Sequence, residues 1–336
     1  MKRNNHHWLI AGRDGVTPLH DAASNGHLDR VPKELLQPKA LLNTNNNGNN
    51  AIHCAAQSGH LDQIPTHVLT GLSSMQAQIA IVKRTMGLAG EVFEGENDEY
   101  GIGINLPEFA GNAKRFIQRI PTLLGNIIVS SNMLLPNKKG VTPLHLAAKN
   151  ANLDQVPVEL LTKANMNAAD SFGTTVLQEA FRGQGCYQLA QELISQETVQ
   201  KRDANGDTAL HIAAERGTLD GVPTELLSEE NMLAPNHAGI TPLHKAAYFG
   251  HMAKVPKKLL TVENLLTIDH SGNTPLHKMA DKSNESQMDY ILGIDFPDSV
   301  KKIVGDKWWN ANEEVKLAMQ KSKQPVQDEE SGVDIF

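Results

Sequence analysis

Gly15-Val16-Thr17-Pro18-Leu19-His20-Asp21-Ala22-Ala23 is the stretch that determines the fold of this chain, because most of it returns at regular intervals. Each copy has a glycine and, two residues later, a four-residue box. The box reads Thr-Pro-Leu-His at 17–20, 142–145, 241–244 and 274–277, and it is degenerate at 50–53, 175–178 and 208–211. The glycines are Gly15, Gly48, Gly140, Gly173, Gly206, Gly239 and Gly272, and within each block they lie 33 residues apart. A fixed period of this length indicates a solenoid of stacked repeats.

The residues of the box predict how each repeat begins. Thr17 stands where an N-cap accepts a hydrogen bond from the first turn of a helix, and Pro18 suits the first helical position because an N–H there would lack a partner. Leu19 and the alanines that follow lie on one helical face, where small side chains let neighbouring helices approach closely. Gly26 then ends the helix. The equivalent glycines are Gly59, Gly217 and Gly250.

The period and the box resemble those of the ankyrin repeat family. The resemblance covers residues 13 to about 293 in seven copies, apart from one insertion. It implies an all-α fold, namely an ankyrin-type helix-turn-helix solenoid with short loops. It also implies that the chain binds another protein.

The second helix of each repeat departs from the usual ankyrin pattern, because a proline follows its Val or Ile in five copies. Proline inside a helix costs about 3 kcal/mol, so we expect each one in the first turn, after an Asp N-cap such as Asp29. The second helix is then short and spans Arg30–Leu36 in the first copy. The five residues are Pro32, Pro65, Pro157, Pro223 and Pro256.

A Ser or Thr followed by acidic residues stands after the second helix, as in Ser228–Leu233 and Thr261–Leu266. Such a cap favours one more helical turn. We therefore expect a third short helical turn in each repeat, and we expect it to replace part of the loops that are usual in the family.

An insertion divides the repeats into 13–70 and 130–293. In both halves of residues 71–129, apolar residues recur at alternating spacings of three and four. Because such seams pack two helices together, we expect an inserted helical hairpin with an acidic, glycine-rich loop. The alternative is a decorated loop without a special function. The seam residues are Leu72, Met75, Ile79, Val82, Met86 and Ala89, then Phe109, Ala113, Phe116, Ile120, Leu123 and Ile127.

The two ends of the array differ. Residues 1–12 form an N-terminal extension that caps the first repeat only in part. Residues 294–323 predict C-terminal capping helices, in which Trp308 and Trp309 cover the apolar end of the solenoid. A partner site at these tryptophans is the alternative. Residues 324–336 are acidic, and we expect them to be disordered.

Composition and charge exclude several classes of protein. The formal net charge of −7 and the lack of a long basic block argue against nucleic acid as the partner. Two cysteines, Cys54 and Cys186, are too few for a disulfide framework and favour a reducing compartment. The apolar run Trp8–Ala11 is too short for a signal peptide, and no stretch is long enough to span a membrane. We expect a cytoplasmic monomer, with export into a host cell as the alternative.

The 14 histidines suggest a metal or catalytic site at first sight. Six of them end a box, and a residue that recurs once per repeat is expected to hydrogen-bond nearby backbone. No pair has the helical spacing and carboxylate partner of a zinc protease. The six are His20, His53, His145, His211, His244 and His277.

Other candidate sites are weak. Cys54 follows His53, but adjacency supplies neither a base nor an orienting group, and we expect a small residue that faces the core. Residues 94–99 lack the spacing of a calcium loop, and Gly101-Ile102-Gly103 lacks the third glycine of a nucleotide fingerprint. We therefore predict no enzyme activity, no cofactor and no metal site.

The variable residues before each glycine predict a partner-binding surface, because they are polar, chemically diverse and free of packing constraints. In ankyrin proteins the equivalent loop tips commonly contact partners. We expect charge reversal of the three cations among them to weaken binding without lowering thermal stability. In the alternative, the repeats present the inserted hairpin 71–129 as an effector or inhibitor. The candidate residues are Asn46, Asn47, Lys138, Lys139, Phe172, Arg202, His237 and His270.

Overall fold

The structure, a computed structural model, describes residues 5–71 and 131–281. The expected capping helices, the acidic tail and the inserted hairpin apart from Gly71 lie outside these residues. The chain forms two compact units, unit 1 (Met1–Leu189) and unit 2 (Ala190–Phe336), and each is described by itself.

Each box begins an α-helix, as predicted. Thr17 is the N-cap of the first of these helices, and its Oγ1 accepts a hydrogen bond of 3.4 Å from the N–H of His20. Pro18 is the first helical residue. In unit 1 the first helices are α1 (Pro18–Ser24), α3 (Ala51–Ser58), α7 (Pro143–Lys149) and α9 (Val176–Arg182). In unit 2 they are α11 (Ala209–Arg216), α13 (Pro242–Phe249) and α15 (Pro275–Asp281).

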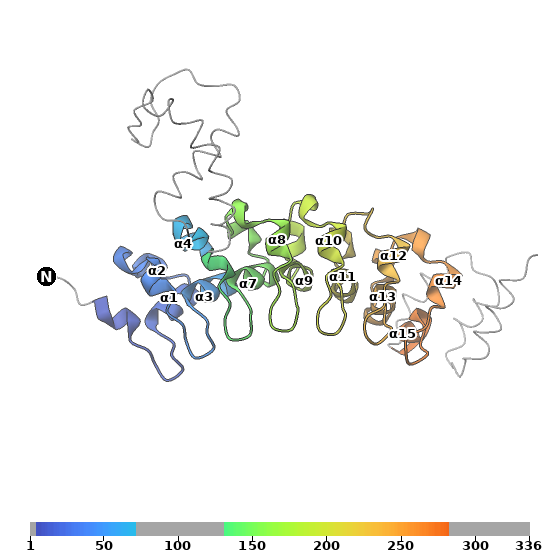
Figure 1. The fold of residues 1–336 in the computed structure, drawn as a ribbon, viewed down its shortest axis with the longest axis horizontal. Helices are drawn as coiled ribbons and strands as arrows, with labels where there is room; N and C mark the ends of the chain where they lie inside the picture. The colour runs from blue at the N-terminus through green and yellow to red at the C-terminus, as the bar shows by residue number, and fades with distance from the viewer. Residues whose placement is uncertain (1–4, 72–130, 282–336) are drawn as a thin grey trace, which may run out of the picture. The chain divides into compact units, whose positions relative to one another are not determined.

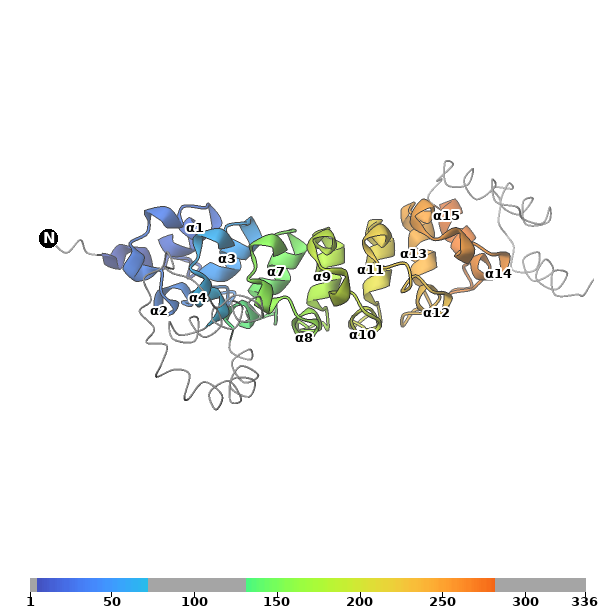
Figure 2. The same ribbon diagram turned by 90° about the horizontal axis from the view of Figure 1, so that it is seen from above.

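The first helices pack side by side within each unit (Figures 1 and 2). In unit 1, α1 contacts α3, α3 contacts α7, and α7 contacts α9. In unit 2, α11 contacts α13, which contacts α15. Alanines such as Ala55 and Ala56, which are fully buried, permit this close approach.

The predicted second helix is wrong, because 3₁₀ turns stand in its place. Arg30–Leu36 is split into η2 (Leu28–Arg30) and η3 (Lys33–Leu35). Val31 between them is extended, with φ −82° and ψ 135°, because a proline disfavours the helical conformation of the residue before it. The N-cap of η2 is His27, and Asp29 lies inside the turn rather than capping it.

The other short elements follow first helices, except η1, which precedes α1. Unit 1 also contains η1 (Asn5–Leu9), η4 (Leu61–Gln63), α4 (Thr66–Thr70), η6 (Asn132–Leu134), η7 (Leu153–Gln155), η8 (Val158–Leu160) and η9 (Gly185–Gln188). Unit 2 contains η10 (Gln191–Leu193), η11 (Leu219–Gly221), η12 (Met252–Lys254) and η13 (Lys257–Leu259).

The predicted third helical turn is present. Thr162 caps one of these turns, where its Oγ1 accepts a hydrogen bond of 3.2 Å from the N–H of Asn165. The turns do not replace the loops, however, and that part of the expectation is wrong. The loops project from each unit on the side away from the third turns (Figure 1). The third turns are α2 (Pro38–Leu41) and α8 (Lys163–Met166) in unit 1, and α10 (Gln196–Val199), α12 (Glu229–Met232) and α14 (Val262–Leu265) in unit 2.

Unit 1 stays continuous on either side of residues 72–130. The side-chain Nδ2 of Asn132 donates a hydrogen bond of 2.6 Å to the carbonyl of Val68. Gln155 bridges the same two repeats, since its Oε1 accepts from the N–H of Leu61 and its Nε2 donates to the carbonyl of Gly59. The second and third repeats therefore contact each other directly.

Candidate partner-binding surface

The loops between repeats are held by one side chain each. The Oδ1 of Asn45 accepts hydrogen bonds from the N–H groups of Asn47 and Asn49, at 2.9 and 3.1 Å. Gly48 then turns the chain with a φ of +81°, a conformation that side-chain-bearing residues rarely adopt. The residues equivalent to Asn45 are Asn137, Asp170, Asp203, Asn236 and Asp269, which accept the same pair of bonds.

Neighbouring loop tips are also joined through their backbones. In unit 1 the N–H of Lys138 donates to the carbonyl of Asn47 at 3.2 Å, and the N–H of Ser171 donates to the carbonyl of Lys139 at 3.0 Å. In unit 2 the N–H groups of His237 and His270 donate to the preceding loops at 3.1 Å. The backbone of the tips is thus fixed before any partner binds.

Five of the predicted site residues lie on consecutive loop tips of unit 1 and are exposed. Asn46 and Asn47 are on one tip, Lys138 and Lys139 on the next, and Phe172 on the third. Phe172 leaves 60% of its surface accessible, although it is a large apolar residue. The surface therefore combines two amides, two cations and one aromatic ring.

The two predicted histidines of unit 2 are exposed but also serve packing. A Cβ on Gly206 would lie 2.7 Å from the Cδ2 of His237, and a Cβ on Gly239 would lie 2.6 Å from the Cδ2 of His270. Each ring thus lies against the glycine of the preceding loop, so substituting it would disturb the loop as well as any contact with a partner.

Arg202 differs from the lysines of unit 1. Its Nη1 donates to the carbonyl of Gly206 at 2.8 Å and to the carbonyl of Pro235 at 2.7 Å. The guanidinium therefore ties its own loop to the next one. The expectation that charge reversal leaves stability unchanged fits Lys138 and Lys139, but it does not fit Arg202.

The box histidines bond the backbone, as predicted. The N–H of Thr17 donates to the Nδ1 of His20, so the Nε2 carries the proton and donates to the carbonyl of Asn49 at 3.1 Å. This arrangement needs a neutral ring, and burial lowers the pKa of His53 and of His211 to about 4. The same interrepeat bond is made by His53, His145, His211 and His244.

Cys54 lies in surroundings that disfavour its thiolate form. It is half-buried rather than fully directed into the core, and burial raises the pKa of its thiol to about 11. Among residues 5–71 and 131–281, no cluster of three His, Cys, Asp or Glu side chains could hold a metal ion.

An ion-pair network that joins α11, α13 and the residue before the N-cap of α11 was not identified from the sequence. Lys245 lies 3.0 Å from the Oδ2 of Asp207 and 2.9 Å from the Oε2 of Glu215. Burial opposes ionisation of Asp207, but hydrogen bonds from Asn236 and Lys245 lower the pKa of its carboxyl below the usual value. The sequence signal that could have indicated this network is Lys245 itself, which stands directly after the box histidine, at a position that varies between copies.

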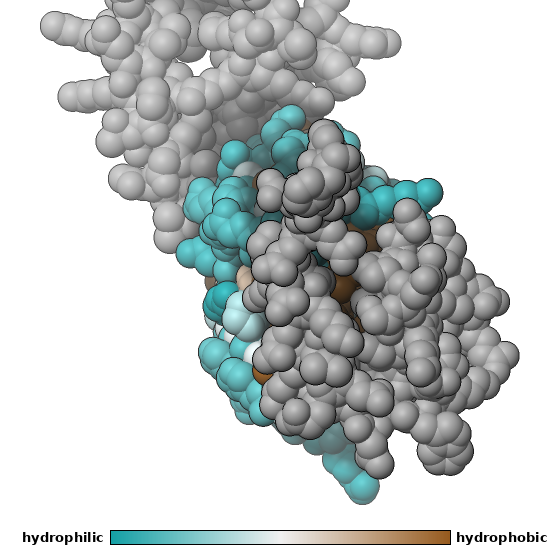
Figure 3. Space-filling view, turned by 90° about the vertical axis from the view of Figure 1, so that its right-hand side faces the viewer, coloured by the Kyte–Doolittle hydropathy of each residue, from teal (hydrophilic) through white to brown (hydrophobic). Residues whose placement is uncertain are grey.

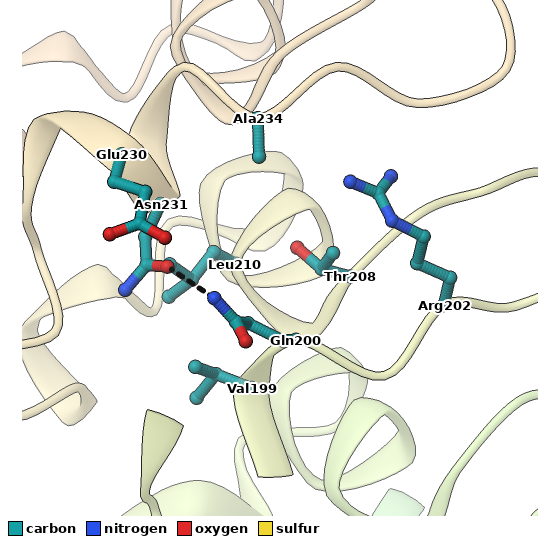
Figure 4. A pocket seen from close by; sticks show the side chains of 8 residues that line it. All are labelled: Val199, Gln200, Arg202, Thr208, Leu210, Glu230, Asn231 and Ala234. Carbon is teal, nitrogen blue, oxygen red and sulfur yellow. Dashed lines mark hydrogen bonds between the residues drawn. The ribbon is translucent and has the colours of Figure 1, made fainter. Parts of the chain in front are cut away.

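Unit 2 also has a cavity of about 310 Å³ between consecutive repeats (Figure 4). Of the predicted site residues, Arg202 lies at this cavity. Its lining consists of Val199, Gln200, Arg202, Thr208, Leu210, Glu230, Asn231 and Ala234. In a view onto the α14 end of unit 2, the described surface is mostly hydrophilic, with small hydrophobic areas (Figure 3).

Stacked helical repeats with projecting loops define a solenoid repeat protein. A family model described as ankyrin repeats matches the chain in three copies, at residues 2–65, 152–232 and 180–260. These matches cover more than half of the residues, and the chain belongs to the ankyrin repeat family. A comparison with curated proteins finds no match. None of the helices within the described ranges is long and apolar enough to cross a membrane.

Proposed function

We propose that this protein is a non-enzymatic scaffold that binds a protein partner through the loop tips of unit 1. Ankyrin repeats generally mediate protein–protein interaction. The observation that carries the proposal is that the backbone of these tips is hydrogen-bonded whereas their side chains are exposed. The backbone is held by the interloop hydrogen bonds, whereas Asn46, Asn47, Lys138 and Lys139 offer exposed side chains that bond no described residue.

Such a surface suits binding, because the loops are already ordered in the folded protein and lose little conformational entropy when a partner binds. Lys138 and Lys139 stand on one tip and Phe172 on the next, so cations flank an exposed aromatic ring. Aromatic residues dominate the energetics of many interfaces, and flanking charges steer the partner. The partner we propose is therefore a protein whose contact region is acidic around an apolar pocket.

A second candidate function is that the repeats present residues 71–129 as the active element of an effector or inhibitor. The bond from Asn132 to the carbonyl of Val68 supports it, because a segment whose two ends are held together can be carried without disturbing the stack. We further propose a cytoplasmic monomer. Neither Cys54 nor Cys186 forms a disulfide within the described residues, which suits a reducing compartment, and export into a host cell is the alternative.

Affinity capture from cell lysate distinguishes the two candidate functions. The full chain is compared with a deletion that joins Gly71 to Ser131. Capture of the same partner by both supports the loop-tip surface. Loss of the partner by a deletion that remains folded would overturn the first proposal in favour of the second.

A further inference from the structure

The cavity of about 310 Å³ in unit 2 lies outside the proposed loop-tip surface of unit 1. Its lining residues belong to the end of α10, the segment after it, the start of α11, and α12 with the residues behind it. The volume is at the lower end of the range found for ligand pockets. It could admit part of a single extended peptide but no folded element.

Two sequence changes coincide at this hollow, and the first of them is confined to one repeat. Val199 is buried at a position where the other third turns carry a longer side chain. Gln200 is polar and exposed where most copies carry leucine. The residues equivalent to Val199 are Leu41, Met133, Met166, Met232 and Leu265, and those equivalent to Gln200 are Leu42, Leu134, Asn167, Leu233 and Leu266.

Opposite charges stand on opposite sides of this cavity (Figure 4). Arg202 is on one side, and its Nη1 is fixed by the carbonyls of Gly206 and Pro235. Its Nε and Nη2 donate to no described residue. The carboxylate of Glu230, which is exposed on α12, accepts no hydrogen bond from a described residue. A ligand would therefore meet a positioned cation at one end and an acceptor at the other.

The carboxamide of Gln200 lies between these charges (Figure 4). Its Nε2 makes one long hydrogen bond of 3.4 Å to the Oδ1 of Asn231, and its Oε1 accepts none from a described residue. A carboxamide with a donor and an acceptor at its disposal has the groups that pair with a peptide bond. The floor beneath it is apolar, with Val199 and Leu210 buried.

We propose that this cavity binds an extended peptide segment of the protein partner, with an acidic side chain against Arg202 and a basic side chain against Glu230. In an extended chain, residues i and i+2 point to the same side, so the two charges are separated by one residue whose peptide group pairs with Gln200. The proposal rests on the proposed function, since it gives the protein partner a second point of contact.

The test uses short peptides and the full chain labelled with ¹⁵N. Acetyl-Glu-Ala-Lys-amide and the reversed acetyl-Lys-Ala-Glu-amide are titrated while backbone resonances are followed, with acetyl-Gln-Ala-Gln-amide as the neutral control. We expect saturable shifts at Val199, Thr208 and Asn231 with at least one charged peptide. We expect E230Q to weaken that binding about threefold, as for an exposed ion pair. E263Q, at the equivalent position of the next repeat, should leave it unchanged.

V199M provides a second test, because methionine is the residue at three equivalent positions and extends into the hollow. We expect this variant to keep its melting temperature and lose the peptide-induced shifts. Equal shifts with the neutral peptide, or shifts with inorganic phosphate and none with the charged peptides, would overturn the proposal. This outcome is distinguishable from failure of the proposed function, which is measured with the intact partner and unit 1 variants.

Discussion

The side-chain amide of Asn132 donates a hydrogen bond of 2.6 Å to the carbonyl of Val68, although 64 positions separate the two residues. In other repeats the same bond spans five positions, from Asn165 to Leu160 and from Asn231 to Leu226. Thr70 and Asn132 thus occupy the positions of a cap and its asparagine. In those other repeats only two residues separate the cap from the asparagine. Here the long connection stands in place of those two residues.

Deletion of residues 72–130 should therefore leave the repeats folded. Joining Gly71 to Ser131 restores a cap, two residues and an asparagine, as in Thr162–Asn165. A shorter connection also lowers the entropic cost of closing the loop, by about 0.6 kcal/mol for each halving of its length. We expect an equal or higher melting temperature by circular dichroism. A fall of ten degrees or so, with loss of helical signal, would show that the repeats depend on the deleted residues.

Removing the amide itself should destabilise unit 1. In N132A the buried carbonyl of Val68 loses the side-chain donor and keeps the N–H of Gly71 at 3.3 Å, and the loss of one such hydrogen bond costs about 0.5–1.5 kcal/mol. N165A should cost a similar amount, because it makes the equivalent bond within one repeat. Urea denaturation measures both, with the exposed N46A as a neutral control. A large effect of N165A beside none of N132A would contradict the equivalence.

Stability should fall as the pH is lowered from about 6.5 towards 4. Burial lowers the pKa of His53 to about 4 in the folded chain, whereas the unfolded chain takes up the proton near 6.5. The folded state therefore binds fewer protons in this window, and each such histidine contributes up to about 1.4 kcal/mol per pH unit. Above pH 7 its contribution is constant. The measurement is the urea midpoint at pH 7.5 and at pH 5.

Histidine-to-glutamine substitution provides the matched control. Gln178 occupies the box position in one repeat, where its Oε1 accepts the N–H of Thr175 at 2.7 Å without titrating in this range. H53Q should thus keep the cap and flatten the pH dependence. An unchanged dependence in H53Q would show that other groups cause it.

Arg202 and the lysines of unit 1 should separate stability from binding. R202A loses donors to two carbonyls and should lower the free energy of unfolding by about 1 kcal/mol. K138E/K139E should leave the free energy within about 0.5 kcal/mol of the parent, since both side chains are exposed. Thermal unfolding measures both. A larger loss of unfolding free energy in K138E/K139E than in R202A would contradict the structural role given to Arg202.

The sequence was sufficient to predict the elements whose signals are local. The Thr-Pro cap marks the first helices, and the Thr162 cap marks a third turn within four residues. The second helix was mispredicted because Pro32 does more than lack an N–H: its ring also disfavours the helical conformation of Val31.

The candidate site was less accessible to sequence reasoning. Exposure of Lys138 and Phe172 follows from their place at loop tips, but the bonds of Arg202 depend on where the next repeat places its carbonyls. The cavity likewise depends on the packing around Val199, which only the folded repeats define.

The most direct test of the account is the affinity of the captured partner for K138E/K139E, measured by titration calorimetry beside the parent chain. The matched control is K257E/K258E, a double reversal at exposed lysines of η13 in unit 2. Loop-tip binding predicts at least tenfold weaker binding for K138E/K139E, unchanged binding for the control and unchanged melting temperatures for both. Parental affinity in a folded K138E/K139E would contradict the claim that the loop tips of unit 1 bind the partner.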